Sequence, residues 1–352
     1  MIRNKIFIFL LFLGISCTKI NHSSDEPVQL DSYIFFDEGT VKTKGNLLTG
    51  TALPTSAGTS YGVMGLRGTS NTQVFGVYAS GNTSTTGNKF KHNNVAYVYR
   101  PAANENFTYE KLVLWTNEPH KFCAYYPYFA SCVTGLVADD AATSGVDPYL
   151  SYTQPTTLAG MTTDLLTAYT EASYNANASA TQNMVGLNFK HRLFAFNVLL
   201  KNTSGTKMVI KEAILTITSP DGAKLYFNGQ VTPNTSTTTI THNYVVRGSD
   251  YTLGSGTVAS PNSIYLNENH FLLLPCSSLN IDFEMTFVNI WGEEVVWNIN
   301  GDITPPTPEG AGFVAGNKYD LVLTRKVIND NVTFVPSVED WGSMADIEHN
   351  FE

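Results

Sequence analysis

The residues closest to a catalytic motif are Gly58 to Gly62, which match the G-x-S-x-G pattern of hydrolase nucleophile elbows with Ser60 as the nucleophile. In such an elbow a strand precedes the serine and a helix follows it, so that the hydroxyl stands on a sharp turn. Here a Pro-Thr-Ser-Ala-Gly turn precedes the serine, and the run Val63 to Gly65 follows it. Because the strand-turn-helix context is missing, we interpret the segment as a glycine-rich turn, with a hydrolase as a minority alternative.

Carboxylate pairs and histidines make no stronger case for catalysis. Adjacent carboxylates in a strand or turn point apart, so we expect Asp139-Asp140 and Glu293-Glu294 to be solvated. His191 lies among strand-like apolar residues, and we expect a hydrogen-bonded core histidine rather than a base or ligand. No histidine pair or Cys-x-x-Cys has metal-site spacing, so the sequence predicts no catalytic residue, no metal and no cofactor.

An aromatic cluster offers binding chemistry instead. It comprises Tyr125, Tyr126, Tyr128 and Phe129 around Pro127. Exposed aromatic rings of this kind can stack on sugars or fill a pocket of a partner. Core packing at the end of a hairpin is the leading interpretation, and ligand stacking is the alternative.

The first segment of the chain has the layout of a bacterial lipoprotein signal. Arg3 and Lys5 precede the apolar run Ile6 to Leu13, which is too short to span a bilayer, and Gly14-Ile15-Ser16-Cys17 follows. We predict that residues 1–17 are the signal peptide and lipobox, and that Cys17 carries the lipid. Gly14 stands where the usual lipobox has leucine, so a cleaved but unlipidated secretory peptide is the alternative. Both readings predict export.

Composition favours an exported β protein. Removing Arg3 and Lys5 with the signal leaves 19 basic against 30 acidic residues, a formal net charge of −11, which argues against a nucleic-acid partner. Charged residues make up only 14% of the chain and aromatics reach 12%, a profile typical of extracellular β proteins. No other stretch of the sequence is long and apolar enough to cross a membrane.

Cysteine usage leaves two possibilities open. Cys123 and Cys132 flank the aromatic segment, and an oxidising compartment would let them close a short disulfide loop. The alternative is that Cys123, Cys132 and Cys276 are all buried free thiols.

Short β-branched and aromatic runs, separated by Gly, Asn, Ser and Pro, predict strands along the chain. The runs are Tyr33–Phe36, Val74–Ala79, Val95–Tyr99, Lys111–Trp115, Lys121–Tyr126, Val185–Leu200, Val209–Ile217, Phe271–Leu274, Ile281–Ile290, Glu294–Ile299 and Tyr319–Thr324. The longest run suggests a bend or bulge, and Asn289 to Glu293 predicts a hairpin. At most one or two short helices are expected, with the segment near Asp164 to Tyr174 as the candidate.

Two all-β domains follow from this spacing. Residues 18–29 are polar and aperiodic, as expected of a tether, and the fold is predicted to begin near Leu30. The polar stretch Lys201 to Thr206 suggests a boundary between a β-sandwich at 30–200 and a second β-sandwich at 201–352.

Several segments are familiar in combination. They are Trp115 with His120–Tyr128, Asp164–Ala168, Val185–Leu193, Ala315–Tyr319 and the late Trp341. In this order, behind a lipoprotein signal, the chain resembles the fimbrillin-like lipoproteins of Bacteroidetes, the pilin and pilin-like subunits of fimbriae.

That resemblance implies two transthyretin-like β-sandwich domains, a lipidated precursor at the outer membrane, and a place in a surface-exposed fimbrium. The implied partners are other fimbrial subunits and a host or bacterial surface ligand. It also implies assembly by strand exchange after a protease removes the first strand, here about Leu30 to Phe36. A trypsin-like cut would fall at Lys42 or Lys44. The family's usual site is an arginine, and Arg67 lies far inside the domain, so an unprocessed anchor or accessory subunit is the alternative.

The C-terminal end offers a second strand for exchange. Asn331 to Trp341 has Val332 and Phe334 on one face, but Pro336 is expected to interrupt it, because proline is tolerated only at an edge or bulge. A surface glycan-binding lipoprotein is the competing function, since the tether and the aromatic residues would serve it equally well.

Overall fold

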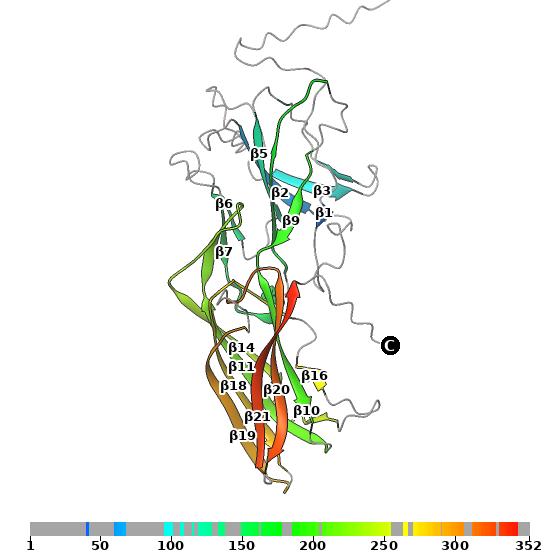
Figure 1. Ribbon diagram of the computed structural model, residues 1–352, viewed down its shortest axis with the longest axis vertical. Coiled ribbons are helices and arrows are strands. Elements are labelled where there is room, and N and C mark those ends of the chain that lie inside the picture. Colours follow the sequence, from blue (N-terminus) through cyan, green and yellow to red (C-terminus); the bar gives the residue numbers. More distant parts are fainter. Residues whose placement is uncertain are drawn as a thin grey trace, which may run out of the picture.

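The computed structural model (Figure 1) describes residues 40–41, 60–67, 95–100, 106–108, 115, 119–128, 133–137, 149–161, 163–177, 185–203, 206–254, 263–266, 270–289, 291–305, 312–328 and 331–343. Strands from the first half of the chain gather at one end of an elongated molecule, and most strands from the second half lie at the other end (Figure 1). The all-β prediction is confirmed.

The N-terminal sheet has seven strands in the order β1-β9-β8-β5-β2-β3-β4. Their bounds are β1 Thr40–Val41, β9 Asn188–His191, β8 Leu166–Ala172, β5 His120–Tyr126, β2 Ser60–Arg67, β3 Val95–Arg100 and β4 Asn106–Thr108. All neighbours are antiparallel except β1 and β9, which pair in parallel. The sequence predicted β3 and β5.

A smaller sheet, which we call the junction sheet, joins strands from both halves of the chain in the order β13-β12-β7-β6. Its strands are β6 Val133–Val137, β7 Tyr149–Thr153, β12 Gly222–Tyr226 and β13 Val231–Pro233. Inward residues of β7 and β12 pack with Cys123 and Tyr125 of β5. The junction sheet is therefore the second layer of the N-terminal sandwich.

Two further sheets form the C-terminal sandwich. The β10 sheet contains β16 Ser263–Tyr265, β10 Phe194–Asn202, β20 Asn317–Ile328, β21 Asn331–Ser343 and β17 Phe271–Leu273. The β11 sheet contains β14 Thr237–Val245, β11 Met208–Pro220, β18 Leu279–Val288, β19 Glu294–Ile303 and β15 Tyr251–Leu253. β10 and β20 are parallel, and the other pairs are antiparallel.

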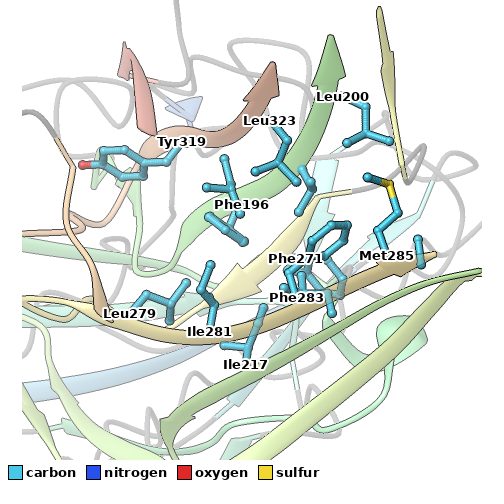
Figure 2. Packing of buried hydrophobic residues seen from close by; sticks show 14 of the residues in the cluster. Phe196, Leu200, Ile217, Phe271, Leu279, Ile281, Phe283, Met285, Tyr319 and Leu323 are labelled. Carbon is cyan, nitrogen blue, oxygen red and sulfur yellow. The ribbon is translucent and has the colours of Figure 1, made fainter. Parts of the chain in front are cut away.

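The largest core lies between these two sheets. Figure 2 shows Phe196 and Leu323 of the β10 sheet facing Ile281 and Phe283 of the β11 sheet, and all four are fully buried. β18 alternates buried and exposed residues along most of its length, since successive side chains point to opposite faces of a sheet. The strand was predicted as a β-branched and aromatic run at Ile281–Ile290.

The hairpin predicted at Asn289 to Glu293 is confirmed. It joins β18 to β19, and the Asn289 side-chain oxygen accepts backbone hydrogen bonds from Trp291 at 3.0 Å and Glu293 at 2.9 Å. Gly292 has a φ of 85°, a conformation that glycine adopts without steric cost.

The prediction of a helix near Asp164 to Tyr174 is wrong. Residues Leu166–Ala172 form β8, which pairs with β5 on one side and β9 on the other. The partners of β8 come from other parts of the chain, so tertiary pairing, and not local propensity, determined that this segment is a strand. The described helix is α2, Leu158–Met161, and no helix in the described ranges is long and apolar enough to cross a membrane.

The bend predicted within 185–200 is confirmed. β9 ends at His191, and β10 begins at Phe194 in a different sheet. The domain boundary between residues 200 and 201 stays a prediction. Strand pairing favours a change of sheet at Arg192 and Leu193, because all of β10 belongs to the C-terminal sandwich.

The expected interruption at Pro336 is also wrong. β21 continues from Asn331 to Ser343 through Pro336, which lies opposite Leu323 of β20. β21 is the outermost strand of its sheet in the described ranges, and only one side of an edge strand takes part in the ladder. A proline without an amide hydrogen is therefore accommodated there.

Candidate assembly site

The edge formed by β9 and β1 is the candidate assembly site. β9 pairs with β8 on its inner side, and on its outer side its partner is β1, through Thr40 opposite Asn188 and Val41 opposite Phe189. Along β9 the residues alternate between exposed and buried. A two-residue strand supplies few ladder bonds, so the outer side of β9 is lightly covered by β1.

A hydrophobic cluster lies beneath this edge. Phe189 of β9 is fully buried and packs edge-to-face against Tyr61 of β2, with ring centroids 5.6 Å apart. The buried members of the cluster are Tyr61, Val63, Trp115, Phe122, Ala124, Leu166, Ala168, Val185, Leu187 and Phe189. The strand that pairs with β9 therefore lies beside a side chain of the core.

The predicted processing site follows directly in the chain. β1 ends at Val41, and Lys42 is the next residue. Lys42, Lys44 and the predicted removable strand Leu30 to Phe36 lie outside the described residues, as does Cys17, so these assignments stay predictions. Sequence reasoning missed β1 itself, because two residues beside lysines carry no periodic signal.

His191, at the end of β9, is buried as predicted. Its Nδ1 lies 2.8 Å from Oδ2 of Asp164, and both side chains are about 5% exposed or less. The pairing of His191 with Leu166 brings the two groups together, since Asp164 lies two residues before Leu166, the first residue of β8. Burial, and to a smaller extent the negative charge of Asp164, raise the pKa of Tyr126.

The serine motif is structural. Ser60 is the first residue of β2, where a strand rather than a helix follows, and its carbonyl accepts a hydrogen bond from the amide of Tyr128 at 2.9 Å. Gly62 is required for packing, because a Cβ there would meet the Tyr125 ring at 2.3 Å. Tyr125 is buried, and Tyr126 and Tyr128 are half-buried against the cores, as the leading interpretation expected.

The remaining candidates do not assemble a chemical site. Glu294 is exposed, and its Oε2 lies 3.5 Å from Nη1 of Arg247. Cys123 is buried in β5, whereas Cys132, Phe129 and the Asp139-Asp140 doublet lie outside the described residues, so the disulfide stays a prediction. Within the part of the chain that the structure describes, no three His, Cys, Asp or Glu side chains gather as metal ligands would.

Comparison with solved structures supports the fold. A fimbrial protein from Bacteroides vulgatus matches with a TM-score of 0.52 at 14% identity, over 88% of this chain and 99% of that chain. A candidate cell adhesion protein from Bacteroides uniformis matches with a TM-score of 0.45 at 18% identity, also over 88% and 99%. A search of curated protein sequences gave no match.

A family model matches most of the chain. The model describes fimbrillin-like proteins and covers residues 66–341, which include the segments that carried the resemblance from Trp115 to Trp341. The chain therefore belongs to the fimbrillin-like family.

Proposed function

We propose that the protein is a non-enzymatic structural and adhesive subunit of a cell-surface fimbria. Membership of the fimbrillin-like family supports this role, and so does the fold shared with a fimbrial protein of Bacteroides vulgatus. The proposal includes export as a lipoprotein precursor, attachment to the outer membrane through Cys17, and partners that are other fimbrial subunits.

The observation that carries the assembly step is the pairing of β1 with β9. Cleavage at Lys42 or Lys44 would separate Thr40 and Val41 from the folded body. The outer side of β9 would then present unpaired amide and carbonyl groups beside Phe189. Such an edge is a template for β-augmentation by a strand of another subunit. Processing at the lysines would thus create the acceptor for the next subunit.

A disulfide between β1 and β9 tests this step. Thr40 and Asn188 are register partners, so cysteines at both positions lie within reach of a disulfide. We expect mild trypsin to cut the purified mature protein after Lys42 or Lys44 and the product to form SDS-resistant multimers. In the oxidised Thr40→Cys/Asn188→Cys protein, the segment N-terminal to the cut, which we call the leader, stays attached through the disulfide, and multimers do not form. Reduction releases the leader and restores them.

Matched lysine variants provide the control. Lys42→Gln/Lys44→Gln should block cleavage and multimers, whereas Lys207→Gln, at an exposed lysine distant in sequence, should behave as the parent protein. A cleaved parent protein that remains monomeric at high concentration contradicts strand exchange. So does a crosslinked, cleaved protein that polymerises without reduction.

A further inference from the structure

The junction sheet is built from two distant parts of the chain. β12, which follows β11 of the C-terminal sandwich, pairs with β7 over five consecutive residue pairs, from Gly222 opposite Thr153 to Tyr226 opposite Tyr149. β13 then pairs with the free side of β12. The β12–β13 hairpin is thus an arm of the C-terminal half that completes the N-terminal sandwich.

Arg192 fixes the end of this arm. One terminal nitrogen of its guanidinium donates to the carbonyl oxygens of Tyr226 at 2.8 Å and Gln230 at 3.2 Å, which bracket the β12–β13 turn. The amide of Arg192 donates to the carbonyl of Leu165 at 2.9 Å. Arg192 is 5% exposed and lies between β9 and β10, where the chain passes from one sandwich to the other. A single buried residue therefore ties the arm to the crossing point.

Gln154 and Asp221 fix the base of the arm. The amide of Gln154 donates to the carbonyl of Asp221 at 2.9 Å. The buried Gln154 side chain donates to the carbonyl of Leu272 and accepts from the amide of Leu274, both at 3.2 Å, so β7 is also bound to the β17 segment. The carboxylate of Asp221 accepts hydrogen bonds from the side chains of Ser236 and Asn234, which lower the pKa of Asp221 and hold the bend from β11 into β12.

A separate hydrophobic cluster fills the space inside the junction. Its buried members are Cys123, Tyr125, Leu150, Tyr152, Leu165, Leu193, Ala195, Ala223, Leu225, Phe227, Leu272 and Leu274. Ala195 and Leu272 belong to β10 and β17, whose other faces line the core of the C-terminal sandwich. The β10 sheet therefore separates two cores, and opening the junction would expose one of them.

We propose that the β12–β13 hairpin is an intramolecular clasp, which makes the two sandwiches unfold as one cooperative unit. Domains in tandem move independently unless a large apolar interface joins them. Here the interface is a shared sheet, a buried guanidinium and the hydrophobic cluster inside the junction. This inference does not depend on the fimbrial role. In a fibre under tension, the clasp would keep the subunit from opening between its sandwiches.

Hydrogen exchange in increasing urea tests the clasp in the mature protein. Peptides covering β5 and β8 report the N-terminal sandwich, and peptides covering β18 and β20 report the C-terminal one. We expect both sets to lose protection at the same urea concentration. Gly222→Ala places a Cβ 2.4 Å from the carbonyl oxygen of Tyr152 and must separate β12 from β7. In this variant the N-terminal set should lose protection first, with its thermal midpoint lower by at least about 5 °C.

Gly186→Ala is the matched control, because a Cβ at that position meets nothing within 4 Å. The two sets of peptides should stay coincident in it. Arg192→Met provides a second variant that removes the guanidinium without a backbone clash, and it should also separate the transitions. When Ser151→Cys/Lys224→Cys is added to Arg192→Met, a disulfide between these facing positions should make the two transitions coincide again. The clasp proposal would be overturned if the two sets of peptides lost protection at different urea concentrations in the parent protein. It would also be overturned if they lost protection together in Arg192→Met.

Discussion

The two outermost strands nearest the ends of the described chain are held very differently. β1 meets β9 through two register pairs, whereas β21 meets β20 through eleven. Both lie at sheet edges, so both could in principle be exchanged. Of the two, only β1 combines a short pairing with a neighbouring predicted protease site. The difference indicates that a position at the sheet edge does not by itself make a strand exchangeable. The strand must also be joined to its neighbour by few register pairs.

Deleting each strand gives the largest test of this contrast. We expect removal of residues 331–352 to cost roughly 5–10 kcal/mol, at about 1 kcal/mol for each ladder hydrogen bond, which approaches the whole stability of a domain. Removal of residues 18–44 from the mature protein should leave it folded, with a small fall in melting temperature. Circular dichroism melts check both. A truncated C-terminus that melts within a few degrees of the parent would contradict the contrast.

Core truncations sharpen the same comparison. Phe283 lies in the central strand β18, and Phe189 lies in β9 beside the weakly covered edge, yet both are fully buried. Phenylalanine to alanine in a core costs about 3–5 kcal/mol, and the cost depends on how far the site can collapse. We expect Phe283→Ala near the upper value and Phe189→Ala near the lower one, measured by urea denaturation. Equal costs would show that the β9 edge is as rigid as the centre of the C-terminal sandwich.

We expect acid to destabilise the C-terminal sandwich by protonating His270. Burial lowers the pKa of this imidazole below 6.5, Asp320 opposes the shift, and Lys318 adds to it. Because the unfolded state then binds more protons, the stabilising contribution is complete above about pH 6.5 and is lost progressively as the pH falls from there through the lower pKa of the folded state. Urea midpoints should drop between pH 7.5 and pH 5.0. The drop should be smaller in His270→Gln, and an unchanged drop would assign the effect to other groups.

The smallest expected effect on stability comes from Cys276. Burial raises the pKa of its thiol to about 12, from an ordinary value near 9, so the thiolate fraction at neutral pH falls by about a thousandfold. Iodoacetamide should label this thiol slowly in the native protein and rapidly in urea. Cys276→Ser should change the melting temperature little. Rapid native labelling would mean that the segment around Phe313, which pairs with Cys276, opens readily.

Part of the C-terminal sandwich was predictable from the sequence, because two of its long strands carry a clear period of two. β11 and β18 bury alternate residues along most of their length, and Asn289 with Gly292 specifies the turn that follows β18. Local pattern and final structure agree there. The same reasoning predicted His191 as a core residue.

Elements whose order depends on distant partners were not predictable. β14 is rich in threonine, and its buried residues are Ile240 and Val245, so its hydrophobic signal is faint. β12 is stabilised by β7, more than 60 residues earlier, and β8 was mistaken for a helix. The candidate assembly site could not be predicted for the same reason, because β1 is a strand only by virtue of its pairing with β9.

The parallel pairing of β10 with β20 has a consequence for the order of folding. Leu199 lies opposite Val322, so more than 120 residues must be present before the central ladder of the C-terminal sandwich can close. Closing such long loops slows folding, because chain entropy is lost before contacts compensate. A chain that emerges with its N-terminus first therefore cannot complete this sandwich until β20 is available. If the chain is exported as proposed, this high contact order would keep it unfolded, and hence competent for translocation, during most of its passage.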